Sequence, residues 1–556
     1  MIETELKAAI AVALRKAQQR GHLPAFDLPE SIPVEHPKQE EMGDLATPVC
    51  LQLARLARMA PIKIAEALRQ HLPPLDFIGA VEVASPGFVN FRLAEPWLQR
   101  QVTAILQAGD RYGQTDYGQG RRVQVEYVSA NPTGYLHMGS ARNAVLGDAL
   151  ASLLAAAGYA VQREYYVNDA GSRMRVFYET LWARYLQALG RPAEVPEDGY
   201  HGADLVEMAQ AIAAEQGDRL LALPSEQALS EVGALGLAKV VERAREDLAL
   251  MGIHYDEWFS EQTLYTDGQF DRIMTILREG GYLDFHDGAV WFNAMGLGGS
   301  KDEVVVRSDG TPGYFASDIA YHYNKFVERG FDTVIDVWGA DHQGHVPRMR
   351  VMMQALGLDP DRLIIIIYQL VTLKRGGEVV RLSKRTGDTI TLREVLDEVG
   401  ADAMRYFLLS RSADSQMEFD LDLAKEQSDA NPVYYIQYAH ARISSILRLA
   451  QGLASGQAAP DLSLLRHPAE LALLRRMVRL PQVVLAAATQ HAPHLLAYYA
   501  YDLAAAFHLF YRDCRVISTE PGDDALTAAR LALVAACRVV LARALRLMGM
   551  TAPEMM

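Results

Sequence analysis

Hydrophobic and polar positions change their spacing twice along this chain, and each change marks a boundary between regions. In the first region, apolar side chains recur at helical spacing over Ile2–Gln19, Thr47–Arg58 and Ile62–Leu72. They then alternate in VEVASPGFVNFRL, residues 81–93, around a Ser-Pro-Gly turn that is typical of two short strands. We therefore predict a separate α+β domain over residues 1–110.

Strand spacing and helix spacing alternate in the next region. Val123–Val128 has the pattern of a strand, an Ala- and Leu-rich helix follows Gly139, and Val161–Val167 has the pattern of the next strand. This βαβ order predicts a parallel sheet. Two further strands are expected at Thr333–Trp338 and Leu363–Tyr368.

The remaining pattern is mostly helical. Residues from Thr180 to about Tyr265 have helix spacing, and we expect them to form an insertion between the two halves of the sheet. After Asn431-Pro432 the chain is nearly all helical to its end, which indicates a helical bundle. The predicted fold is α/β: a doubly wound parallel sheet in residues 111–428, an N-terminal α+β domain, and an all-α bundle in residues 429–556.

Composition fits a soluble protein of several domains. Of the 556 residues, 50% are hydrophobic and 22% are charged, a composition that is ordinary for a globular protein. A chain of this length is too long for one hydrophobic core. We expect no membrane span, because the most apolar run, Leu363–Leu373, is shorter than the roughly 18–20 residues required. The N-terminus is acidic rather than basic, and Cys50, Cys514 and Cys537 form no CxxC pair. A reducing cytoplasm and no structural metal are therefore expected.

The net charge of −15 is unevenly distributed. From Ser428 onward the chain has 12 arginines, no lysine and nine acids, a net +3, which leaves −18 for the rest. Arginine is the cation best suited to phosphate and base contacts. Arginine-only usage is also typical of GC-rich genomes, so charge alone does not establish RNA binding.

The stretch EYVSANPTGYLHMGSARNAVLGD, residues 126–148, has the pattern of a phosphate site. A strand, a turn containing Gly134 and a helix N-terminus would point backbone N–H groups and the helix dipole at an anion. His137, at the mouth of the turn, adds a donor that can stabilise charge developing on a phosphate.

A second group of charged residues lies in VVRLSKRTGDTIT, residues 379–391. Arg381, Lys384 and Arg385 share a polar loop with Ser383, before a helix that opens with a capping box at Thr391. Such a loop can hold a triphosphate, although a charged surface loop has the same composition. The sequence contains no Walker A loop, no GxGxxG after a strand and no HExxH, so ATP handling would involve the His137 turn.

Together these two segments resemble the HIGH and KMSKS motifs of class I aminoacyl-tRNA synthetases. Five further blocks are similar to those of one member family, the arginyl-tRNA synthetases of bacterial type. They are YVSANPTG, EYYVNDAG, VWGADHQGH, DLDLAKEQSDANPVYYIQYAHARI and the ending RLMGMTAPEMM. The resemblance covers essentially the whole chain. It implies a class I Rossmann-like catalytic domain, an N-terminal tRNA-binding domain and a C-terminal helical anticodon-binding domain.

The resemblance also implies a reaction and its partners. Arginine would attack the α-phosphate of Mg2+-bound ATP to give arginyl-adenylate and pyrophosphate, and the 3′ end of tRNA(Arg) would then accept the arginyl group. The family generally needs bound tRNA before it activates the amino acid. We further expect a cytoplasmic monomer without a membrane partner.

Site residues carry over by position. The resemblance implies catalytic roles for His137, Ser140 and Lys384. It implies that ATP is bound by Thr133, Gly134, His137, Gly139, Ser140, Ser383, Lys384 and Arg385. It implies that arginine is bound by Asn131, Tyr314, Asp318 and Asp341. If YFASDIAYHY is helical, Tyr314 and Asp318 share one face, and carboxylates suit the planar fork of a guanidinium.

Several residues of these blocks could instead have purely structural roles. Asp318 could form a surface ion pair, Tyr314 could be core packing, and Asn168 and Asp169 could be turn formers. His342 and His345 resemble a metal pair but have no third ligand, so we interpret them as lining residues.

Two positions depart from the motifs. Ser140 stands where the second histidine belongs, and Arg381 stands at the first lysine of the KMSKS-type loop. A neutral donor in place of a charged one costs about 1 kcal/mol, or roughly five- to tenfold in rate, so we expect a slower enzyme. The alternatives are an activation-deficient tRNA-binding paralogue and a class I synthetase for another amino acid.

Overall fold

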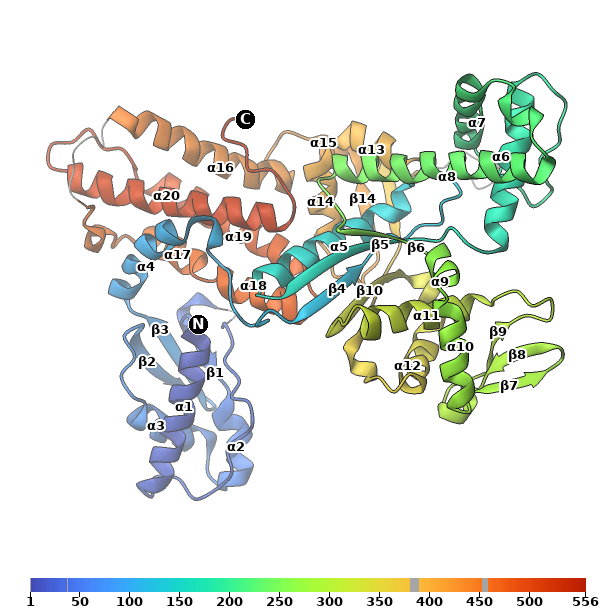
Figure 1. Ribbon diagram of the computed structural model, residues 1–556. Coiled ribbons are helices and arrows are strands. Elements are labelled where there is room, and N and C mark those ends of the chain that lie inside the picture. The colour runs from blue at the N-terminus through green and yellow to red at the C-terminus, as the bar shows by residue number, and fades with distance from the viewer. Residues whose placement is uncertain (1, 38, 381–389, 453–458) are drawn as a thin grey trace.

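The computed structural model describes residues 2–37, 39–380, 390–452 and 459–556. Its N-terminal region is an α+β unit that projects from the rest of the molecule (Figure 1). A three-stranded antiparallel sheet has the order β1-β3-β2. Its elements are α1 (Ile2–Gln19), β1 (Leu45–Thr47), α2 (Val49–Ala57), α3 (Pro61–His71), β2 (Ile78–Ala84) and β3 (Phe88–Leu93), followed by α4 (Glu95–Ala108).

The centre of the molecule is a five-stranded parallel sheet of order β11-β10-β4-β5-β6. Its strands are β4 (Arg122–Glu126), β5 (Ala160–Val167), β6 (Glu257–Ser260), β10 (Thr333–Gly339) and β11 (Leu363–Tyr368). Helix α5 (Met138–Ala156) connects β4 to β5, as the sequence predicts. The strand order reverses between β4 and β10, and the carboxyl ends at such a point are where α/β sheets bind ligands.

The predicted helical insertion differs from the structure at its C-terminal end. Helices α6 (Ser172–Ala188), α7 (Ala203–Gln216) and α8 (Ser225–Leu250) are present, but the stretch up to Tyr265 also contains β6. The helices therefore separate β5 from β6 within one half of the sheet, not its two halves. Strand β6 was missed because four residues, EWFS, are too short to show alternation.

Several smaller elements complete the central region. Between β6 and β10 lie α9 (Gln262–Thr266), α10 (Gln269–Glu279), a three-stranded sheet of β7 (Leu283–His286), β8 (Ala289–Phe292) and β9 (Glu303–Val306), α11 (Tyr314–Tyr323) and a π-helix (Asn324–Glu328). Helix α12 (Val346–Ala355) follows β10. After β11 come β12 (Val371–Arg375), β13 (Glu378–Val379), α13 (Leu392–Val399), α14 (Ala401–Leu409), β14 (Met417–Asp420) and α15 (Leu421–Lys425).

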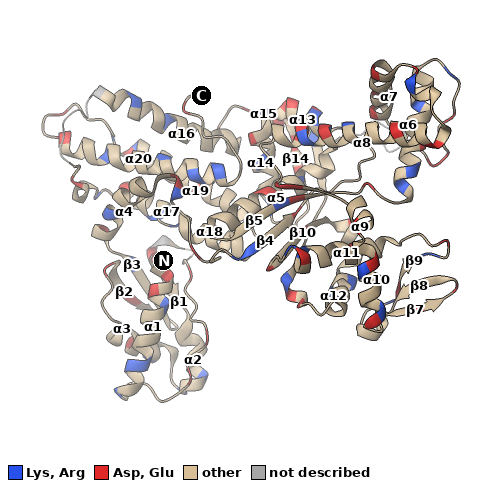
Figure 2. Ribbon diagram, in the orientation of Figure 1, with Lys and Arg blue, Asp and Glu red and all other residues tan. Residues whose placement is uncertain are grey.

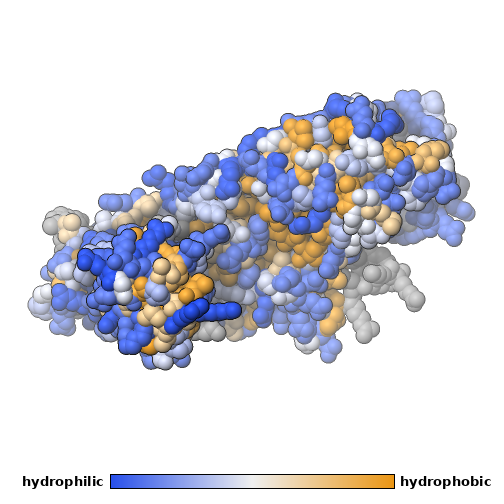
Figure 3. All heavy atoms as spheres, turned by 90° about the horizontal axis from the view of Figure 1, so that it is seen from below, coloured by the Kyte–Doolittle hydropathy of each residue, from blue (hydrophilic) through white to orange (hydrophobic). Residues whose placement is uncertain are grey.

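The C-terminal region is all helical and packs beside the central sheet and above the N-terminal unit in Figure 1. Its helices are α16 (Pro432–Leu449), α17 (Pro468–Met477), α18 (Leu480–Thr489), α19 (His494–Asp513) and α20 (Asp524–Leu547). Figure 2 shows charged residues of both signs on all three regions. In Figure 3, hydrophobic residues gather toward the middle of the face seen from below.

Helix α20 is more apolar over a membrane-spanning length than the sequence analysis expected of any segment. Among the described helices it is the one that is long and apolar enough, by length and composition, to cross a membrane. Core helices of soluble proteins meet the same criteria. Here Leu533, Val540 and Leu545 are fully buried in the main hydrophobic core.

Candidate active site and nucleic-acid interface

His137 caps the helix that begins at the predicted phosphate turn. Its Nδ1 accepts a hydrogen bond of 3.0 Å from the backbone N–H of Gly139, and α5 starts at Met138. Burial of the ring lowers the pKa of His137, which favours the neutral imidazole. Because Nδ1 is an acceptor, the proton lies on Nε2, and His137 offers one N–H donor away from the helix.

Several amides of this turn have partners within the protein, whereas the sequence predicts free N–H groups that point outward. The N–H groups of Met138, Gly139 and Ser140 donate to Ile390 O, His137 Nδ1 and His137 O. The N–H of Tyr135 donates to a carboxylate oxygen of Asp204 at 3.1 Å. An anion at this turn would therefore depend on side-chain donors as well as on the backbone.

Asp204 comes from α7 in the helical insertion, and no sequence pattern indicated it. A Cβ on Gly134 would lie 2.6 Å from its carboxylate oxygen, so a larger residue there would displace the Asp204 side chain. Thr133 lies in the same turn, and its N–H donates to the carbonyl of Asn131 at 2.8 Å. The insertion thus contributes a carboxylate to the edge of the turn.

The backbone between β4 and the turn is strained. Val128 and Ser129 have φ values of 69° and 42°, a region that β-branched residues rarely enter. The N–H of Val128 donates to Asn143 Oδ1 at 2.7 Å, and Ser129 Oγ donates to Glu126 at 3.0 Å. Asn143 also donates to Val337 O of β10 at 2.9 Å, so one buried amide ties the carboxyl ends of β4 and β10. Such strain persists where surrounding contacts fix the backbone, commonly at functional sites.

The segment just after the basic loop of the second motif pairs with the His137 segment. Ser383, Lys384 and Arg385 lie outside the part of the chain that the structure describes, and so does Arg381. In this pairing, His137 and Thr391 form a β-bridge, and Leu392 N–H donates to Leu136 O at 2.8 Å. Thr391 forms the predicted capping box with Glu394.

Asp318 and Tyr314 lie on α11 at spacing four, as the sequence predicts. The side chain of Asp318 is 38% exposed to solvent. One of its carboxylate oxygens lies 3.6 Å from a guanidinium nitrogen of Arg348. Desolvation raises the pKa of Asp318, although the charge of Arg348 opposes this shift. Tyr314 is 54% exposed beneath the guanidinium of Arg307, so it is not part of the core.

Glu261 is a second acid close enough to Asp318 to be affected by its charge, and the sequence patterns did not indicate it. Glu261 is 6% exposed and directly follows β6. Its place at the carboxyl end of a strand suggests a ligand contact, but this inference requires that β6 be recognised as a strand first. Burial first, and then the charges of Asp318 and Asp169, raise its pKa to about 7. A carboxyl group with such a pKa can change its charge when a cation binds.

Asn168 and Asp169 hold neighbouring residues in place. Asp169 accepts from Ser260 Oγ at 2.6 Å and from the N–H of Gln262 at 2.9 Å. Asn168 Nδ2 donates to Asn131 Oδ1 at 3.2 Å. These contacts link the end of β5 to Asn131 and to the segment that carries Glu261.

Asp341 follows β10 and is 78% exposed, 3.5 Å from His342. The rings of His342 and His345 lie 5.5 Å apart. Within the described ranges, no group of three or more His, Cys, Asp or Glu side chains is placed to hold a metal ion.

A buried charge network lies beneath these side chains. Lys325, on the π-helix, donates to Glu126 at 2.5 Å and to Asp336 at 3.0 Å and is inaccessible to solvent. His322 lies 2.8 Å from the carbonyl of Asp318 and 3.0 Å from Asp336. Against the effect of burial, the charge of Lys325 and the contacts with Lys325 and His322 lower the pKa of Asp336 to about 2. These side chains connect β4, β10 and α11.

Aromatic side chains form a surface on the C-terminal region. Tyr434 and Tyr438 of α16 stack with ring centroids 5.8 Å apart. The guanidinium of Arg442 lies 4.5 Å from the ring of Tyr438 and 4.8 Å from that of Tyr511, which is 38% exposed. Tyr498 and Tyr501 of α19 are also exposed. Exposed aromatic rings beside arginine are typical of surfaces that stack unpaired RNA bases.

Comparisons with known proteins agree along the whole chain. Three family models match: an arginyl tRNA synthetase N terminal domain at residues 4–93, a class I (R) tRNA synthetase catalytic domain at residues 101–188 and 239–443, and a DALR anticodon binding domain at residues 436–556.

Individual relatives match over nearly their full length. An arginine--tRNA ligase of Dehalococcoides mccartyi is 51% identical over 549 residues, 99% of this chain and 98% of the relative. That of Heliobacterium modesticaldum is 50% identical over 569 residues, 100% and 99% of the two chains. The arginyl-tRNA synthetase structure of Thermus thermophilus covers all of both chains at 25% identity, with a TM-score of 0.75.

Proposed function

We propose a division of roles among the residues of this chain, which belongs to the arginyl-tRNA synthetase family. The chain is an arginine--tRNA ligase: it activates arginine with ATP and transfers the arginyl group to tRNA. The observation that best supports the proposed site is the pair Asp318 and Glu261, two partly desolvated acids near the carboxyl end of the sheet. Two such carboxylates suit one planar guanidinium.

For arginine, we assign Asp318 and Glu261 to the guanidinium and Asn131 to the α-amino and carboxylate end. Asn168 orients Asn131 through its amide. Tyr314 supplies a ring face at the start of α11, and Asp341 lies at the end of β10. In this arrangement arginine would extend from α11 toward the turn after β4.

For ATP, we assign the turn with Thr133, Gly134, His137, Gly139 and Ser140. The Nε2–H of His137 would donate to the α-phosphate as charge develops during in-line attack by the arginine carboxylate. Ser383, Lys384 and Arg385 would neutralise the leaving pyrophosphate. Support for their proximity comes from Thr391 and Leu392, which pair with residues 136–137 just after that loop.

Mg2+ would enter with ATP, bound to its phosphates, rather than as a resident metal. No side chain is needed as nucleophile, because positioning and charge stabilisation dominate phosphoryl chemistry. The residues would align arginine's carboxylate with the α-phosphate and hold the developing charge.

For tRNA, we assign residues 1–110 and 429–556 as binding domains flanking the catalytic residues 111–428. Tyr438 and the exposed Tyr511, which lie beside Arg442, would stack bases of the anticodon loop. We further propose that the protein acts in the cytoplasm as a monomer and without a membrane partner.

Arginine-dependent ATP–pyrophosphate exchange, with and without tRNA(Arg), tests the proposal. We expect exchange with arginine that requires the tRNA. No exchange under either condition would favour the activation-deficient paralogue, and exchange driven by another amino acid would favour a synthetase of different specificity. Exchange that never depends on tRNA would remove only the coupling between tRNA binding and activation.

A further inference from the structure

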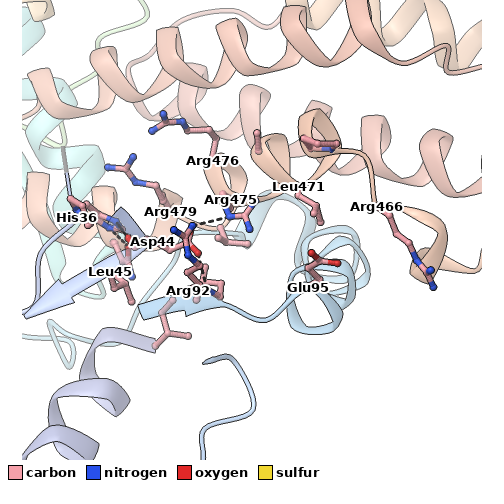
Figure 4. Close-up of a pocket in the computed structure, with 18 residues that line it drawn as sticks. His36, Asp44, Leu45, Arg92, Glu95, Arg466, Leu471, Arg475, Arg476 and Arg479 are labelled. Carbon is pink, nitrogen blue, oxygen red and sulfur yellow. Dashed lines mark hydrogen bonds and ion pairs between the residues drawn. The ribbon is translucent and has the colours of Figure 1, made fainter. Parts of the chain in front are cut away.

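The helical insertion reaches the turn that we propose binds ATP. The N-terminal unit instead packs on the helical region, through a cavity of about 430 Å³ whose lining residues lie within 2–95 and 466–482. Figure 4 shows Arg475 pointing at Asp44 across this junction, where they form an ion pair of 2.9 Å. Figure 1 shows α8 running from α6 and α7 toward α13, the helix that follows the basic loop.

Two acidic side chains of the insertion bear on the His137 segment. The first is Asp204 of α7, whose carboxylate accepts from the N–H of Tyr135 at 3.1 Å. The ring of Tyr135 packs against the hydrophobic core of the insertion, and the guanidinium of Arg243 lies 5.2 Å from the ring centroid. The chain is therefore held by α7 and α8 two residues before His137.

The second acid is Asp247, near the C-terminal end of α8. Asp247 is 1% exposed, and its Oδ1 accepts from the Nε of Arg393 at 2.7 Å. The Nε of Arg243, one turn earlier on α8, lies 3.1 Å from the same oxygen. Asp247 is thus a buried acid shared by two arginines, one from its own helix and one from α13.

Arg393 connects this acid to the His137 segment. It is the second residue of α13 and comes directly after Thr391 and Leu392. His137 and Thr391 form a β-bridge, and Leu392 N–H donates to Leu136 O at 2.8 Å. Both members of this pairing are therefore anchored on the insertion.

We propose that Asp247 is a positioning residue for ATP and that it acts through Arg393. By holding the start of α13 where it pairs with the His137 segment, the contact fixes the outward Nε2–H of His137 relative to the rest of the turn. Orientation contributes strongly to rate, and a displacement of about 1 Å can cost on the order of 10²-fold. The inference rests on the proposed assignment of ATP to this turn.

Pyrophosphate exchange by the full-length protein with tRNA(Arg), at varied ATP and arginine, tests this role. Asp247→Asn keeps the shape of the side chain but removes the charge that holds Arg393. We expect kcat/KM for ATP to fall by at least about tenfold, through a higher KM for ATP. The KM for arginine should change by less than about twofold, because Asp318 lies on α11, outside this pairing.

Glu231→Gln is the matched control, since Glu231 forms a partly exposed ion pair with Arg219 elsewhere on α8 and should leave both KM values unchanged. Arg393→Gln breaks the same contact at a side chain that is 26% exposed, so it tests the proposal if Asp247→Asn folds poorly. It should produce the same fall. The double variant should lose no more than either single variant, because the two side chains act as a unit.

Unchanged ATP kinetics in both single variants would overturn the proposal. So would a fall in kcat with both KM values unchanged, which indicates only a smaller folded fraction, or a double variant whose loss is the product of the single losses. Calorimetric binding of ATP to the same variants needs no exchange and should weaken in parallel with the higher KM. A failure of this role is therefore distinguishable from a failure of the proposed function.

Discussion

The ammonium group of Lys325 lies 2.5 Å from the carboxylate of Glu126, where solvent does not reach it. The pair joins the π-helix after α11 to Glu126, the last residue of β4, which lies five residues before Asn131. The same ammonium holds Asp336 of β10. One cation therefore connects the π-helix that follows α11 with both strands at the reversal of the sheet.

Lys325→Met should lower the free energy of unfolding by about 3–5 kcal/mol, because it leaves two buried carboxylates without their cation. Glu126→Gln in the same chain should restore part of the loss by removing one of those charges. Urea unfolding measures both effects. Lys239→Met, at a partly exposed pair with Glu215, is the control and should cost at most about 1 kcal/mol. Equal losses at the two lysines would contradict the role of the buried network.

Asp318→Asn should raise the KM for arginine by roughly ten- to 150-fold, because a charged hydrogen bond contributes about 1.5–3 kcal/mol. The KM for ATP should change little, since the nucleotide is assigned to the other side of the site. Pyrophosphate exchange at varied arginine and ATP gives both constants. Asp284→Asn, an exposed acid on β7, is the matched control. An unchanged arginine KM would remove Asp318 from the pocket.

Arginine kcat/KM should rise with pH through about pH 7. The pKa of Glu261 is raised to about 7, so its carboxyl group is neutral below that pH and ionised above it. Only the ionised form attracts a guanidinium. In Glu261→Gln this limb of the pH profile should be absent, with low kcat/KM throughout. A variant that keeps the same limb would assign the titration to another group.

His137→Asn should separate the two roles of this histidine. Asparagine is a strong N-cap and can still accept from Gly139, but it lacks the outward Nε2–H donor. Turnover should fall by about 10²- to 10³-fold with little loss of stability. His137→Ala should lose the same activity and also about 1 kcal/mol of stability. Full activity in His137→Asn would show that the ring serves only as a cap.

Ser140→Ala should slow activation by about fivefold, the value of one neutral hydrogen bond. The KM for arginine should not change, because Ser140 lies in the turn that we propose binds ATP. Single-turnover formation of arginyl-adenylate with bound tRNA isolates the chemical step. If the alanine variant is as fast as the unaltered enzyme, the Ser140 hydroxyl makes no contribution to activation. Serine would then not replace the donor that the second histidine of the HIGH motif supplies.

Much of the fold was predictable from local patterns. Spacing alone placed α1 at its observed bounds, β5 and β11 to within a residue at each end, and α5 directly after the His137 turn. These elements are long, or bounded by glycine and proline, so their periodicity is clear. Four-residue β6 has no such signal, and pairing with β5 makes it a strand.

The sequence by itself determined the family and the reaction, because motif residues and their spacing are local. Only the tertiary structure decided which side chains meet. Glu261, Asp204 and Asn143 lie far from their partners in sequence, or in an element with no pattern of its own. The pKa of Glu261 and the partners of the turn's amides depend on burial and long-range contacts, which are properties of packing rather than of sequence.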